Sequence, residues 1–320
     1  MSRFVRQLLP FGSLLLIICF LSAYEPDTFL TLENFMNVLR RSSVNGIIAV
    51  GMTSVIISAG IDLSVGSMLA LSGMTGAYAM IAIGGTDPHG GALVFGTIVA
   101  IVTGIVCGSI NGVLITKLKL PPFIVTLGTM SAFRGISYVM NAGQPYNVPS
   151  YKYLGSGVVL GIPISVVIVA VIVAIAGFLL RYSRLGRYTY AIGSNREAAF
   201  HAGVNVDRNL IYIYTLTGLY VGIAAMIATS RTVSAQPTAG ITLELDIIAS
   251  VVIGGASLAG GRGTITGTII GTLLISFLRN GCTLLGISTN VQLIVIGAII
   301  IAAVAVDQLA RSKAEAVKTG

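Results

Sequence analysis

The residues of this sequence that could do chemistry are a few ionisable side chains within or beside long apolar runs. They are Asp62, Arg134, Glu244, Asp246 and Arg279. A charge held among apolar segments is costly unless it faces protein or water. These side chains therefore either line a polar route or pair with one another and lock helices together. For Asp62 a structural role as a helix N-cap is a further interpretation.

Uncharged polar side chains in the same runs are also candidates, because hydroxyl and amide groups can replace the hydrogen bonds that a solute makes with water. Burying a hydroxyl without a partner costs roughly 2 to 7 kcal/mol, so a solute with several hydroxyls cannot cross hydrocarbon alone. The scarcity of charge favours a neutral polar solute over an ion. The predicted pathway residues are Asn45, Asp62, Ser64, Thr126, Arg134, Gln236, Glu244 and Asp246. Further polar candidates are Thr53, Ser54, Asn111 and Thr129.

Motifs for nucleotide binding, hydrolysis and metal binding are missing. The sequence has no G-x-x-x-x-G-K-[ST], H-E-x-x-H or G-x-S-x-G, and its histidines are His89 and His201 alone. Cys19, Cys107 and Cys282 have no metal-ligand spacing. We therefore expect no cofactor or metal on this chain, no ATPase of its own and no enzymatic site.

Composition indicates a polytopic membrane protein. The 320 residues are 55% hydrophobic and only 9% charged, with a mean hydropathy of +0.93. Soluble domains carry about 25% charged residues. Long apolar segments must cross a bilayer as helices, since unpaired backbone groups cannot be left in hydrocarbon. The predicted fold is all-α, a single transmembrane domain over residues 1–320.

About ten spans can be placed along the chain. The first could also be a cleaved signal peptide, but Leu21 stands where a small residue is wanted and Pro10 interrupts the run. Residues 27–41 read as an amphipathic segment on the membrane surface. A glycine row at positions 104, 108 and 112 predicts close helix packing. The predicted spans are residues 7–23, 42–59, 63–83, 92–116, 122–140, 158–180, 210–230, 247–260, 264–278 and 291–306.

The basic residues predict the orientation of these spans. With ten spans and both termini cytoplasmic, thirteen of the nineteen Lys and Arg residues fall in cytoplasmic segments and five outside, with Arg134 inside a span. This bias is the expected one. Arg40 and Arg41 are the main misfit. The net charge of +8 is thus better explained by orientation than by nucleic-acid binding.

The longest polar interval, residues 181–208, is predicted to be cytoplasmic and to contain a short helix. Ser194 and Glu197 have the S-x-x-E spacing of a capping box, which satisfies backbone N–H groups at a helix start. Gly203 can take the left-handed conformation that ends many helices. The alternative is an ordinary basic loop with an incidental turn of helix.

Two stretches share a layout. Residues 55–66 and residues 251–260 are each an apolar run broken by glycine and followed by another apolar helix. Transporters are often built from repeats with glycine-interrupted helices near the site. The alternative to an internal repeat is that these are two unrelated glycine-rich helix junctions that look alike.

Several motifs, in order, resemble those of a known family. Residues 197–203, EAAFHAG, resemble the E-A-A-x-x-x-G element of ABC importer permeases, although the usual I-x-L-P continuation is absent. Residues 44–46, 49–52, 60–67, 184–188, 235–240, 244–246 and 254–261 complete the likeness. Over residues 28–307 the chain resembles the ribose/xylose group of sugar permeases, and so a type II-like ABC importer permease.

This resemblance implies a division of labour among subunits. It implies two ATPase subunits that bind ATP and magnesium, a second permease copy or paralogue, and a periplasmic binding protein that delivers a monosaccharide. The location would be the bacterial cytoplasmic (inner) membrane. The ATPase-docking helix would comprise Ser194, Asn195, Glu197, Ala198, Ala199 and Gly203.

An ion-coupled secondary transporter of a small polar solute is the alternative function. It would be expected to place a carboxylate or histidine deep within a span. Arg134 is the mid-span charge that the sequence predicts instead.

Overall fold

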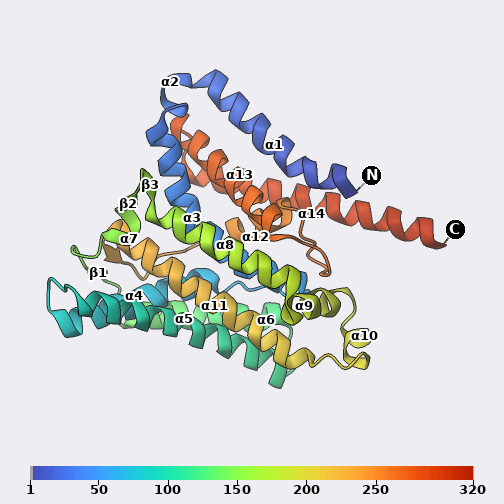
Figure 1. Cartoon of the computed structure of the whole chain (residues 1–320), viewed down its shortest axis with the longest axis horizontal. Coiled ribbons are helices and arrows are strands. Elements are labelled where there is room, and N and C mark those ends of the chain that lie inside the picture. The colour runs from blue at the N-terminus through green and yellow to red at the C-terminus, as the bar shows by residue number, and fades with distance from the viewer. Residues whose placement is uncertain (1–2, 320) are drawn as a thin grey trace.

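In the part of the chain that the structure describes, the protein is a bundle of helices with four very short strands (Figure 1). The structure, a computed structural model, describes residues 3–319, without the side chains of residues 3–10, 13, 17, 303 and 306–319. Its helices are α1 (Arg3–Tyr24), α2 (Pro26–Phe29), α3 (Leu32–Ile57), α4 (Val65–Gly84), α5 (Gly91–Lys117), α6 (Pro122–Val139), α7 (Tyr153–Ser156), α8 (Ile164–Tyr182), α9 (Arg184–Ser194), α10 (Arg196–His201), α11 (Val206–Thr232), α12 (Leu243–Ile253), α13 (Ile265–Leu284) and α14 (Thr289–Thr319).

The strands form two small antiparallel pairs. β1 (Tyr146–Asn147) pairs with β4 (Ser234–Ala235), with Tyr146 opposite Ala235. β2 (Val158–Val159) and β3 (Ile162–Pro163) form a hairpin before α8. These pairs connect helices, so the all-α architecture is confirmed.

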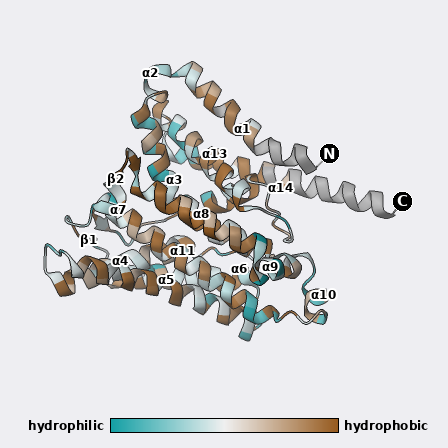
Figure 2. Cartoon of the chain, in the orientation of Figure 1, coloured by the Kyte–Doolittle hydropathy of each residue, from teal (hydrophilic) through white to brown (hydrophobic). Residues whose placement is uncertain are grey.

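Five helices of the described chain are long and apolar enough to cross a membrane, namely α4, α5, α8, α11 and α13. The α8 ribbon is almost continuously apolar, whereas α10 is hydrophilic (Figure 2). A polytopic membrane protein is thus confirmed, while the count of ten spans stays a prediction. The terminal basic residues used for orientation, Arg3, Arg6, Arg311, Lys313 and Lys318, have side chains outside the described part.

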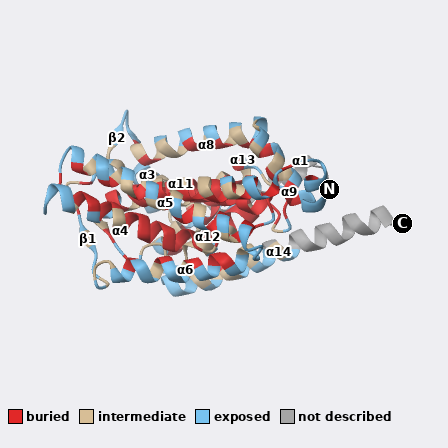
Figure 3. Cartoon of the chain, turned by 90° about the horizontal axis from the view of Figure 1, so that it is seen from below, coloured by how far each residue is buried: buried red, intermediate tan, exposed pale blue. Residues whose placement is uncertain are grey.

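The core is formed around α3, α4 and α11, each of which carries more buried residues than any other helix, while α6 and α8 are largely exposed on opposite sides (Figure 3). α5 packs closely on α11 through glycine. A Cβ atom on Gly104 would overlap the Gly218 carbonyl oxygen, and one on Gly108 would overlap that of Tyr214. The close packing predicted from the glycine row is confirmed.

Several predicted boundaries were wrong. Residues 27–41 are not a separate surface segment, because residues 32–57 form the single helix α3, which includes Arg40 and Arg41. Residues 158–163 form the β2–β3 hairpin rather than the start of a span. α13 continues to Leu284, so Arg279 lies inside a helix and not in an external loop. Tertiary partners extend these helices beyond their apolar runs.

Candidate functional site

The polar interval at residues 181–208 folds into two short helices. α9 begins after Ser183, whose hydroxyl accepts the N–H of Gly186 at 3.1 Å. α10 begins after Asn195, whose side-chain oxygen accepts the N–H of Ala198 at 2.9 Å. The predicted capping box was therefore wrong in one respect. Ser194 is the last residue of α9, and Asn195 caps the helix that carries the E-A-A motif.

The end of α10 confirms the predicted role of Gly203. Its φ is +82°, and its N–H donates to the Phe200 carbonyl at 2.9 Å. The N–H of Val204 donates to the Ala199 carbonyl at 3.0 Å, which completes a Schellman motif. Ala199 and Val204 are buried and anchor the helix, while Phe200 is 66% exposed. α10 is thus fixed on one side and open to a partner on the other.

Three predicted pathway residues lie in a buried hydrogen-bonded cluster around residues 58–64, the break between α3 and α4. They are Asp62, Ser64 and Thr126. Asp62 accepts from the backbone N–H of Ser64 at 2.9 Å and from its hydroxyl at 2.6 Å. Because α4 begins only at Val65, with Ser64 at its N-cap position, Asp62 is not the helix N-cap. Asn111 donates to the Ser64 hydroxyl at 2.8 Å and accepts from Thr129 at 2.7 Å. Thr126 contacts the same break through the carbonyl of residue 61, at 3.2 Å.

A second group forms around Arg134, which is half-buried in α6. Its Nη1 donates to the carbonyl oxygens of Pro237 and Ala239 at 2.7 and 2.6 Å. This holds the loop between β4 and α12, where Gln236 is exposed. The charge of Glu244, in the first turn of α12, interacts with that of Arg134. Arg134 therefore lies together with the segment that carries Gln236 and Glu244, which is far from it in the sequence.

Asp246 belongs to a separate ion pair. Its Oδ1 lies 2.8 Å from Nη2 of Arg279, and the two side chains are 8% and 25% exposed. The pair joins α12 to α13, so for Asp246 the alternative of locking helices together is the one observed. Asn45 is half-buried on α3 and is not part of either hydrogen-bonded group.

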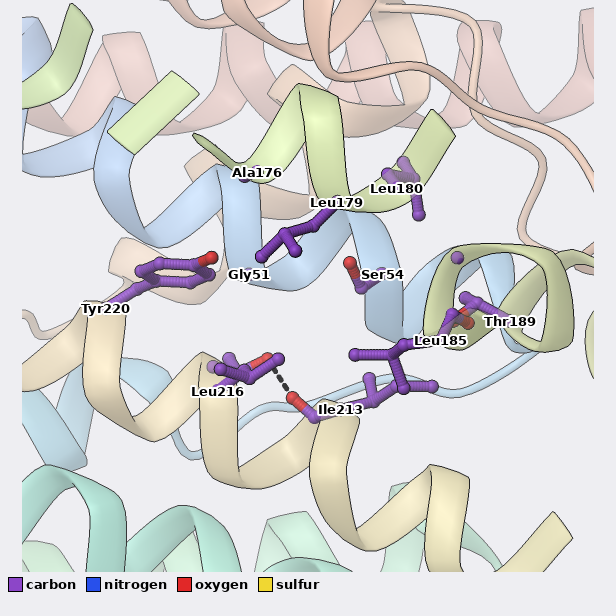
Figure 4. A pocket seen from close by; sticks show the side chains of 12 residues that line it. Gly51, Ser54, Ala176, Leu179, Leu180, Leu185, Thr189, Ile213, Leu216 and Tyr220 are labelled. Carbon is purple, nitrogen blue, oxygen red and sulfur yellow. Dashed lines mark hydrogen bonds between the residues drawn. The ribbon is translucent and has the colours of Figure 1, made fainter. Parts of the chain in front are cut away.

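A small cavity of about 30 Å³ lies elsewhere, among α3, α8, α9 and α11 (Figure 4). Its wall is mainly apolar, with Leu179, Leu185 and Leu216 among the lining residues. Ser54, one of the further polar candidates, lines it, but none of the eight predicted pathway residues does. In the described part of the chain, no group of three or more His, Cys, Asp and Glu side chains could hold a metal ion.

Comparison with known proteins decides the family. Residues 34–304 match the family model described as branched-chain amino acid transport system / permease component. The chain belongs to this permease family. The permease is 42% identical to the ribose import permease protein of Haemophilus influenzae over 319 residues, covering 98% of this chain and 96% of the relative. It is 45% identical to that of Bacillus subtilis over 308 residues, covering 95% and 93%.

A third relative is the D-allose transport system permease protein of Escherichia coli, 39% identical over 301 residues, covering 93% of the permease and 90% of the relative. No solved structure gives a match.

The family model and these relatives show that the permease is a transport component rather than an enzyme, the membrane subunit of an ABC importer. Such a subunit works with ATPase and binding-protein partners.

Sequence reasoning missed α9, and with it Tyr190 and Gly193. Ser183 followed three residues later by Gly186 was the available signal, but a serine of this kind is common in loops. The short α9 has few apolar residues, and its position depends on distant segments, which a local pattern does not reveal.

Proposed function

We propose that the permease imports a monosaccharide. The observation that carries this proposal is its likeness, over nine-tenths or more of the chain, to relatives named as ribose and D-allose permeases. The exposed amide of Gln236, beside the half-buried Arg134 and Glu244, fits a neutral solute with several hydroxyls, which needs polar partners in place of water.

The proposed assembly contains two permease subunits, two ATPase subunits that bind ATP and magnesium, and a periplasmic sugar-binding protein. It lies in the bacterial cytoplasmic membrane with both termini of the permease cytoplasmic. In support, α9 and α10 lie at the same end of the molecule as both chain ends (Figure 1), as an ATPase-docking segment would require. The docking residues are Asn195, Glu197, Ala198, Ala199 and Gly203, with Ser194 at the junction of the two helices.

Within the permease, we propose that Arg134, Gln236 and Glu244 face the translocation route. They combine exposed or half-buried polar groups with an ordered backbone loop. Asp62, Ser64 and Thr126 would shape the route by holding the break between α3 and α4, because Oδ1 of Asp62 and the hydroxyls of Ser64 and Thr126 bond to protein. Asn45 remains a proposed lining residue.

Transport in liposomes tests the function. We expect uptake of labelled ribose or another monosaccharide to require the ATPase, ATP and the binding protein together. Uptake by this chain alone, driven by an ion gradient, would instead establish a secondary transporter. Uptake of a branched-chain amino acid in place of sugars by the complete assembly would contradict the substrate class.

Replacing Arg134 by Gln is expected to lower sugar uptake about tenfold while the complex still assembles and hydrolyses ATP. Hydrogen bonds to a charged group contribute about 1.5–3 kcal/mol each, and half-exposure of Arg134 reduces this. About 1.4 kcal/mol suffices for a tenfold change in the population of the ordered loop. Uptake by reconstituted complexes is the measurement.

Arg134→Lys is the matched control, because lysine keeps the charge but lacks the guanidinium geometry. We expect an intermediate rate for it. Wild-type uptake in Arg134→Gln would show that the loop does not depend on this side chain.

A further inference from the structure

Two helix breaks meet at the end of the bundle where α9 lies. The first break is residues 58–64, between α3 and α4, and the second is residues 254–264, between α12 and α13. The N–H of Gly261, in the second break, donates to the carbonyl oxygen of Ile57, the last residue of α3, at 2.8 Å. The similar layouts noted in the sequence are thus two helix ends in direct contact.

Through Gly193, α9 packs at once on the end of α3, where the first break begins, and on the second break. A Cβ atom on Gly193 would overlap the Ile57 carbonyl oxygen and lie 2.7 Å from the Gly261 nitrogen. From the other side, a Cβ atom on Gly260 would lie 2.6 Å from the Gly193 carbonyl oxygen. The Tyr190 hydroxyl, one turn earlier, donates to the Gly263 carbonyl at 2.8 Å. The three segments therefore touch backbone to backbone, with no room for a side chain.

Helix formation does not explain why residue 193 is a glycine. Glycine inside a helix is less favourable than alanine by roughly 0.5–1 kcal/mol. Gly193 is buried in the last turn of α9, so its presence is explained by the contact with the two breaks. A backbone contact of this kind transmits displacement directly, because close-packed groups cannot move past one another without a gap opening.

The contact connects the docking segment with the proposed route. The first break carries Asp62 and continues into α4, whose Gly66 lies against the Gly240 backbone. That backbone belongs to the loop held by Arg134. The second break begins where α12 ends, and the first turn of α12 carries Glu244. Movement of the two breaks would therefore reach both sides of the Arg134 group.

We propose that Gly193 is a positioning residue for transport, through which the α9–α10 segment holds both helix breaks as one unit. This proposal rests on the proposed function, since it takes α10 as the ATPase-docking helix. Displacement of α10 by the ATPase moves α9, and α9 carries the end of α3 and the second break with it. The route at Arg134 changes shape as a result.

Gly193→Ala tests the proposal, with Gly177→Ala as its matched control. Gly177 lies in α8 and has nothing within 4 Å of its Cβ position. In the complete complex we expect Gly193→Ala to reduce sugar uptake at least tenfold while ATP hydrolysis continues, so that more ATP is used per sugar. Gly177→Ala should match wild type. Equal coupling in the two variants would overturn the proposal.

Spin-label distances keep the test decisive if Gly193→Ala fails to fold. Labels at Ala191→Cys and Ala259→Cys, both exposed, report on α9 and on the second break. A Cys19→Ser background suffices because Cys107 and Cys282 are buried. We expect the same distance with and without ATP. A nucleotide-dependent change would show that the segments move separately and would overturn the proposal.

Failure of the proposal for Gly193 can be distinguished from failure of the proposed function. If the wild-type complex does not import sugar, the proposed function fails, whereas the label distance can still be measured. Tyr190→Phe removes only the bond to Gly263 and keeps the packing. A smaller rise in ATP used per sugar is expected for it, and the absence of any rise in both Tyr190→Phe and Gly193→Ala would count against the contact.

Discussion

Sugar uptake by the Gly203→Val variant is expected to fall about tenfold or more, while ATP hydrolysis continues and the permease remains in the membrane. Gly203 has a φ of +82° and nothing within 4 Å of its Cβ position. The cost of valine is therefore conformational and not steric crowding. A left-handed backbone costs a non-glycine residue roughly 1–2 kcal/mol, and β-branching makes it worse.

The expected physical result is that the last turn of α10 opens. The two Schellman hydrogen bonds, to the carbonyls of Phe200 and Ala199, depend on the left-handed residue. Without them, the exposed face of α10 is no longer held at a fixed angle to α9. Uptake and ATP hydrolysis measured on the same reconstituted complex would show this as loss of coupling.

Gly203→Asn is the matched control, because asparagine tolerates the left-handed region far better than valine. It should retain most of the coupled uptake. Normal coupled uptake in Gly203→Val would instead contradict the docking role proposed for α10.

Asp246→Ala is expected to destabilise the folded permease by about 3 kcal/mol, at the lower end of the range for breaking a buried ion pair, because Arg279 is a quarter exposed. The substitution leaves the Arg279 guanidinium without its carboxylate between α12 and α13. Thermal unfolding of the purified permease in detergent is the measurement, and a markedly lower Tm is the expected result.

Two controls separate the ion pair from a general effect of losing a carboxylate. Asp207→Ala removes the exposed pair with Arg196, where the charged groups are 3.7 Å apart, and should cost less than about 1 kcal/mol. The double variant Asp246→Leu with Arg279→Met removes both charges and should recover most of the lost stability. Equal Tm values for Asp246→Ala and Asp207→Ala would contradict the role assigned to the pair.

Some features of the site could be predicted because they depend on neighbours in the chain. Gly203 ends α10 through bonds to residues three to five positions away, and Gly104 and Gly108 recur on one face of a single helix. The helix start was placed one residue early, at Ser194, because serine and asparagine are both good caps and only the path of the chain chooses between them.

Other features depend on residues far apart in sequence. Asp246 could have joined a polar route, and its pairing with Arg279 follows from α13 extending six residues beyond its predicted end at residue 278. Likewise the apolar run of residues 42–59 does not reveal that α3 begins at Leu32, since the polar first turns are stabilised by contacts such as that of Asn34 with Asn280.

The sequence by itself therefore determined the class of the protein, its membrane character, the family motifs and the end of α10. These follow from composition and from short-range backbone chemistry. The tertiary structure alone decided that Arg134 lies together with the segment that carries Gln236 and Glu244, and that Gly193 of α9 touches the end of α3 and the second break. Such contacts join residues tens to more than a hundred positions apart, and they form only when whole helices pack.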